Sequence, residues 1–74
     1  MKLYEFINHI KHNKVYINIS NKFNHSIYSG TIGTYKTSVI KDKINESDVK
    51  FIYPYKDKDG FDITTDNEDI RWKN

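Results

Sequence analysis

The sequence predicts an α+β domain in which one N-terminal amphipathic helix packs on one face of a four-stranded, largely antiparallel sheet. Apolar residues recur at helical spacing in residues 3–10, alternate with polar residues in 15–19, and alternate again on both sides of a turn in 49–65. A helix with an apolar stripe and a sheet with an apolar face bury both surfaces when they stack. The expected order is helix, strand, strand, connection, strand, strand.

The predicted helix is defined by Leu3, Phe6, Ile7 and Ile10, which occupy positions i, i+3, i+4 and i+7. This spacing indicates an amphipathic helix of about ten residues. A helix of that length is unstable alone in water, so its apolar stripe is expected to lie on the sheet.

The first predicted strand contains Val15, Ile17 and Ile19, which alternate with polar or aromatic residues. These three side chains are expected to face the helix. Tyr16 and Asn18 alternate with them, and Tyr16 is therefore expected on the opposite, open face of the sheet.

The second strand is predicted at residues 27–32 and pairs antiparallel with the first. Whether Ile27 or Tyr28 faces inward stays open. Residues 34–44 show no period of two, and they predict a connection with at most one helical turn.

The last two strands are predicted as a hairpin whose turn lies at residues 57–60. Gly60 is expected to adopt positive φ after a type I turn. Pro54 has no N–H to donate, so its strand is expected at an edge of the sheet, or bulged near Pro54.

The alternation in this hairpin also predicts which side chains face the core. If it is regular, alternate residues point to one side. The predicted core side then carries Val49, Phe51, Tyr53 and Tyr55, continued by Phe61, Ile63 and Thr65. The predicted outward side carries Lys50, Ile52 and Pro54.

The length of 74 residues allows one small domain, predicted at residues 1–66. Residues 67–74 are a polar tail that contains Trp72, with a short extra strand as the alternative. The chain has no cysteine, which excludes disulfides and thiolate zinc sites. Charge interrupts the first residues and no long apolar run occurs, so we expect a cytoplasmic protein with no membrane partner.

The reactive side chains of the sequence predict neither a catalytic site nor a metal or cofactor site. His9 and His12 are three residues apart on the predicted helix, but no acidic residue completes a zinc site with them. Asp57 and Asp59 suggest a calcium loop, yet Tyr55 stands where an EF-hand requires an acidic residue. The turn explains the same residues more simply, and we expect that the protein is not an enzyme.

Five segments together carry a resemblance to a group of known proteins: residues 2–7, 15–17, 27–30, 48–52 and 60–63. They resemble the short phage and mobile-element proteins of low-GC Gram-positive bacteria. This resemblance implies an inhibitor of host defences or a small regulator.

The open sheet face is the expected binding surface, and its candidate residues are Tyr16, Asn18, Lys50, Ile52 and Trp72. Tyrosine beside an isolated isoleucine is typical of a protein-binding patch. We therefore expect a non-enzymatic binding protein whose partner is a protein of the bacterial host. Aromatic residues interleaved with lysines favour an alternative, a regulator that binds single-stranded nucleic acid, although the net charge is only +2. A homodimer is a third reading.

Overall fold

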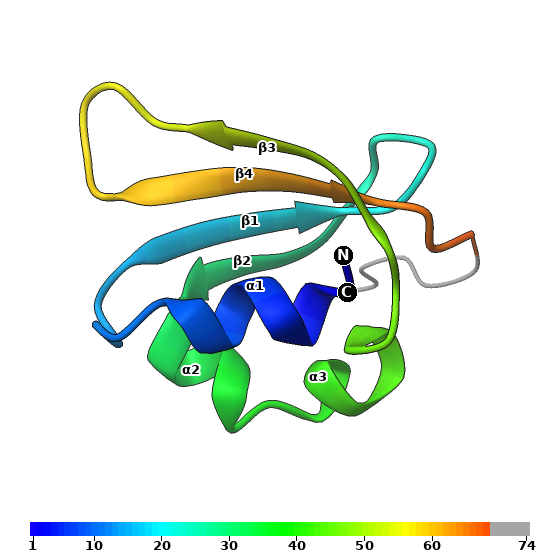
Figure 1. Cartoon of the computed structure of the whole chain (residues 1–74), viewed down its shortest axis with the longest axis horizontal. Coiled ribbons are helices and arrows are strands. Elements are labelled where there is room, and N and C mark those ends of the chain that lie inside the picture. The colour runs from blue at the N-terminus through cyan, green and yellow to red at the C-terminus, as the bar shows by residue number, and fades with distance from the viewer. Residues whose placement is uncertain (69–74) are drawn as a thin grey trace.

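The computed structural model describes residues 1–68 of the chain. Its elements are, in order, α1 (Leu3–His9), β1 (Tyr16–Ser20), β2 (Ser26–Thr31), α2 (Ile32–Lys36), α3 (Val39–Ile44), β3 (Val49–Pro54) and β4 (Gly60–Thr65) (Figure 1). The predicted α+β class and the order of the predicted elements are confirmed. The connection differs from the prediction, because it holds two short helices instead of at most one helical turn.

The sheet consists of two hairpins that lie side by side in the order β2-β1-β4-β3. Each hairpin is antiparallel, and the central pair of strands, β1 and β4, is parallel. The sheet is therefore mixed. Parallel neighbours need a long crossover, and α2 and α3 lie in the connection that carries the chain from one edge strand, β2, to the other edge strand, β3.

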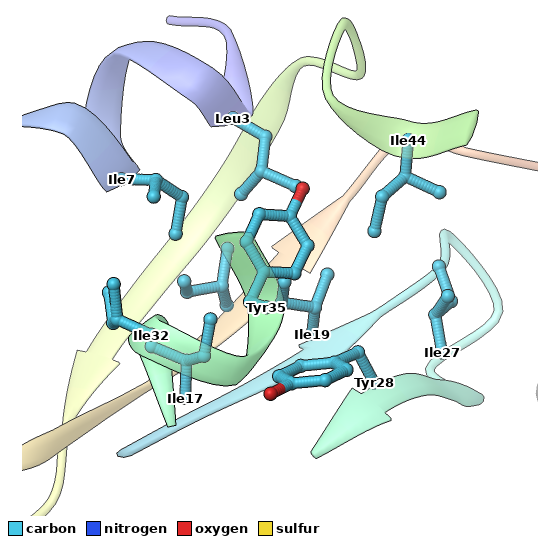
Figure 2. Packing of buried hydrophobic residues seen from close by; sticks show 10 residues of the cluster. Leu3, Ile7, Ile17, Ile19, Ile27, Tyr28, Ile32, Tyr35 and Ile44 are labelled. Atoms are coloured by element: carbon cyan, nitrogen blue, oxygen red, sulfur yellow. The ribbon is translucent and has the colours of Figure 1, made fainter. Parts of the chain in front are cut away.

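Helices α1, α2 and α3 lie on the same side of the sheet and cover one of its faces (Figure 1). The buried core between them consists of Leu3, Ile7, Ile17, Ile19, Ile27, Tyr28, Ile32, Tyr35, Ile44 and Ile63 (Figure 2). Phe6, Ile10 and Val15 are partly buried and pack against this core. The predicted helix stripe and the inward face of the first strand are thus confirmed, although α1 is shorter than expected.

Residues Ile27 and Tyr28, whose orientation the sequence left open, are both buried. The register shifts here, because Ile19 pairs with Tyr28 whereas Ser20 pairs with Ser26, which leaves Ile27 as an extra residue. A bulge of this kind interrupts the alternation, so that two consecutive side chains reach the same face.

A second register shift, at Lys50, decides which face the side chains of β3 occupy. Val49 pairs with Thr65 but Phe51 pairs with Thr64, so Lys50 is the extra residue. Beyond it, Ile52 pairs with the buried Ile63 and lies on the core side. A slip of one residue moves every following side chain to the other face.

The predicted orientation of β3 is consequently wrong for the residues after Lys50. Phe51 and Tyr53 were expected in the core and are instead 53% and 60% exposed on the open face. Ile52 and Pro54 were expected to face outward and lie on the core side, opposite Ile63 and Phe61. Val49 packs against the core as predicted, because it precedes the slip.

The edge position predicted from Pro54 is confirmed, since β3 is the last strand of the sheet. The N–H of Tyr55 donates to the carbonyl oxygen of Gly60 at 3.0 Å. Antiparallel ladders alternate between inward and outward bonds, so the nitrogen of Pro54 falls on the outer side, where no bond is lost.

Gly60 is needed for a close approach and not for the positive φ that the sequence predicted. It is not among the residues with positive φ. A Cβ at this position would lie 2.5 Å from the backbone oxygen of Tyr16 and 2.9 Å from Cδ2 of Tyr55. Only glycine leaves room for β1 and the Tyr55 ring at the start of β4.

The two buried tyrosines provide a test of the core. Tyr35→Phe is expected to raise the free energy of unfolding by about 1 kcal/mol, because it removes a buried hydroxyl that has no hydrogen-bond partner within residues 1–68. Tyr28→Phe is expected to lower it by about 1 kcal/mol, because the Tyr28 hydroxyl donates to the carbonyl oxygen of Thr31 at 2.7 Å. Chemical denaturation measures both changes. If both variants lost the same free energy of unfolding, the claim that only the Tyr28 hydroxyl is hydrogen-bonded would be contradicted.

Candidate binding face of the sheet

The candidate site is the open face, defined here as the sheet face that α1, α2 and α3 do not cover. Strand alternation and register place one residue from each strand in a central row, and further residues flank this row on both sides. The central row is Ser29, Asn18, Asp62 and Tyr53. Tyr16 and Tyr55 flank this row on one side, and Phe51 and Thr64 flank it on the other.

The most exposed apolar part of the open face is a pair of aromatic rings on β3. The ring centroids of Phe51 and Tyr53 are 6.2 Å apart and the ring planes are inclined by 20°, so the rings are stacked. Both residues are more than half exposed. Two large side chains of low conformational entropy are thus presented together, which favours contact with a partner.

A second aromatic pair, Tyr16 and Tyr55, is covered by a lysine from the β3–β4 turn. The ring centroids are 5.9 Å apart, and Lys58 Nζ lies 4.2 Å from the Tyr16 centroid and 4.9 Å from that of Tyr55. Each ring face attracts the ammonium group. Burial raises the pKa of Tyr55, and the negative charge of Asp62 raises it further.

The centre of the open face is a polar network that spans three strands. Asn18 Nδ2 donates to Asp62 Oδ1 at 3.0 Å. The hydroxyls of Ser26 and Ser29 donate to Asn18 Oδ1 at 2.9 Å and 2.6 Å. These bonds fix the orientation of the Asn18 amide, and they hold one carboxylate between the two aromatic pairs.

The free edge of β3 is protected against pairing with another strand. The N–H of Val49 donates to the backbone oxygen of Met1 at 2.8 Å, and Lys2 forms a bridge with Asp48. Pro54 removes a donor at the other end of the strand. Edge strands that are covered and carry proline resist further pairing, so the open face, rather than this edge, is the candidate surface.

The predicted site residues occupy different places. Tyr16 and Asn18 lie on the open face, and alternation from Val49 places the exposed Lys50 there as well. Ile52 lies on the core side, so its predicted place on the open face is wrong. Trp72 lies outside the described residues.

Five residues at the open face were not among the predicted candidates: Phe51, Tyr53, Tyr55, Lys58 and Asp62. The hairpin itself holds a signal for Tyr53. Pairing counted backward from the turn aligns Tyr53 with Asp62 and Ile52 with Ile63, as the structure does. Ile63 belongs to the core, so this count would have placed Tyr53 on the open face before any bulge was known.

Two other features are absent from residues 1–68: a cluster of metal ligands and a long apolar helix. No three histidine, aspartate or glutamate side chains gather there in a group able to hold a metal ion. His9 lies on α1 with its Nδ1 at 2.7 Å from the backbone oxygen of Glu5. Over the same residues, no helix has the length and apolar character required to cross a membrane.

Comparison with known proteins gives no family assignment. No family model, curated protein or solved structure matches this chain.

The polar network can be tested by adding a second carboxylate. Asn18→Asp places a negative charge opposite Asp62, and we expect it to lower the free energy of unfolding by about 1–2 kcal/mol at neutral pH. Repulsion raises the pKa of the coupled pair in the folded state above the unfolded value. The loss should therefore shrink as the pH falls from about 7 to about 4.

Denaturation at several pH values measures this recovery. Asp62→Asn is the control, because it adds no charge and should show no recovery in acid. A loss in Asn18→Asp that is independent of pH would contradict the proximity of the two side chains.

Proposed function

We propose that the protein is a non-enzymatic binding protein whose open face docks on a partner protein. The observation that carries this proposal is the stacked pair Phe51 and Tyr53, which is more than half exposed on the sheet face that the helices leave uncovered. Burying such a pair against a partner removes apolar area from water at little cost in side-chain entropy.

The composition of the open face supports a protein partner. Protein interfaces combine an aromatic centre with a polar rim. Here the pair from β3 adjoins the hydroxyl and amide groups of Asn18 and Ser29. The net charge of the named side chains is also small, because Lys50 and Lys58 supply two positive charges and Asp62, in the middle of the face, supplies one negative charge.

The resemblance to phage and mobile-element proteins supports a more specific form of this proposal. The partner would be a protein of the bacterial host, and a component of host defence is the first class to test. The protein would then act in the cytoplasm by covering a functional surface of that component.

Single-stranded nucleic acid is the second candidate partner. Two aromatic pairs on one sheet face, with Lys58 beside them, can stack bases. Against this, the Lys58 ammonium already lies over two of the rings, and Asp62 would repel the phosphate backbone. Nucleic-acid binding relies on a basic track, and the named side chains of the open face include only Lys50 and Lys58 as cations, with Asp62 between the aromatic pairs, which favours the protein partner.

Replacement of the exposed pair tests the proposal. The double variant Phe51→Ser, Tyr53→Ser is expected to stay folded and to lose at least about tenfold in affinity for the partner, because exposed aromatic residues dominate binding energy. Partners are captured on the immobilised protein from lysates of low-GC Gram-positive hosts and quantified. Affinity for each captured protein is then measured.

The matched control is Val39→Ser, which removes an apolar side chain that is 78% exposed on α3, away from the open face. It should retain binding. Equal capture by wild type and the double variant would overturn the proposal. Oligonucleotide binding that weakens steeply with salt, without specific protein capture, would replace it with the second candidate. Sedimentation at several concentrations reports whether the partner is a second copy of the chain.

A further inference from the structure

A hollow of about 330 Å³ lies among α1, α2 and α3, on the opposite side of the sheet from the open face. Its lining includes Asn8 from α1, Tyr35 and Lys36 from α2, and Lys41 and Asn45 around the end of α3. The volume is within the range of small-molecule sites. The side chains that line it are mostly hydrogen-bond donors or cations.

Tyr35 is the unusual member of this lining. Its side chain is fully buried, and its hydroxyl has no hydrogen-bond partner among the described residues. Figure 2 shows the hydroxyl pointing from α2 toward Leu3 of α1. Buried polar groups are nearly always paired, so an unpaired one calls for a specific explanation. Phenylalanine would fill the same space without this cost.

The charges around the hollow define what it would bind. Lys36 and Lys41 both line it, and within residues 1–68 neither forms an ion pair. Asp42 is the nearby opposing charge, and after burial it is the next cause of the raised pKa of Tyr35. Two ammonium groups, a hydroxyl and the amides of Asn8 and Asn45 form a set rich in donors, which suits a small oxyanion.

We propose that this hollow binds a small molecule bearing an oxyanion, a phosphate or a carboxylate, with Lys36 and Lys41 as the cations and the Tyr35 hydroxyl as a buried donor. The hydroxyl is buried in the free protein, so its bond to a ligand requires a small separation of the helices around it, and this movement is part of the proposal. Helices α2 and α3 have five and six residues, and helices this short depend on packing for their stability. This inference does not rest on the proposed function, because the two surfaces are separate.

The test is a titration of the full chain with inorganic phosphate and, separately, with succinate, followed by the backbone amide signals in NMR at constant ionic strength. We expect saturable shifts at Asn8, Lys36 and Asn45 with at least one of these probes. Saturation by phosphate alone identifies a phosphate ligand, and saturation by succinate alone identifies a carboxylate ligand. Absence of saturable shifts with both probes would overturn the proposal.

Two lysine variants distinguish binding in the hollow from a general attraction of anions to positive charge. Lys41→Gln is expected to weaken binding at least about fivefold, because it removes a charge-assisted bond. Lys43→Gln makes the same change of charge at an exposed position of α3 outside this lining, and should bind as the wild type does. Equal weakening in both variants would overturn the proposal.

Tyr35→Phe tests the buried donor. This variant keeps the ring and is expected to fold, and its binding should weaken about threefold or more because the donor is lost. Unchanged binding in a folded Tyr35→Phe variant would overturn the role assigned to the hydroxyl.

Discussion

The register slip at Lys50 is the constraint on which the exposed surface of this protein depends. Without the extra residue, regular alternation from Val49 would turn Phe51 and Tyr53 toward the helices and Ile52 toward solvent. With it, Ile52 pairs with Ile63 on the core side, and the two rings stack on the open face. One unpaired residue in an edge strand thus turns two aromatic rings from the core side to the open face.

The slip also fits the packing of the covered face. Helices α1, α2 and α3 already bury Tyr35 and Tyr28, whose ring centroids are 5.4 Å apart, together with the aliphatic residues of the core. At the β3 edge, Val49 packs against this core and Ile52 lies on the core side opposite Ile63. Pro54 ends the strand on the side where no ladder bond is lost.

Much of the fold could be predicted because the relevant signals are local. The stripe from Leu3 to Ile10 and the alternation from Val15 to Ile19 arise from the geometry of a single element. Bulges are different, since pairing between strands determines them. The alternation of Val49, Phe51 and Tyr53 continues in the sequence past the extra Lys50, and the adjacent Ile27 and Tyr28 left their orientation open. The role of Gly60 was also hidden, because it depends on the approach of β1 from a distant part of the sequence.

The candidate site was predictable only in part for the same reason. Tyr16 and Asn18 belong to a strand with regular alternation, and their face followed from it. Phe51 and Tyr53 follow a bulge, so the same rule placed them wrongly. The hollow beside Tyr35 had no signal in the sequence, because three helices from different segments build it. That the Tyr35 hydroxyl has no partner among residues 1–68 is likewise visible only once the chain is folded.

The face occupied by Phe51 and Tyr53 is the central claim, and nuclear Overhauser contacts of their ring protons test it most directly. The account predicts contacts between the two rings, and from them to Thr64 and Asp62 on the same face. Contacts from either ring to the methyl groups of Leu3 or Ile7 in the core would contradict it.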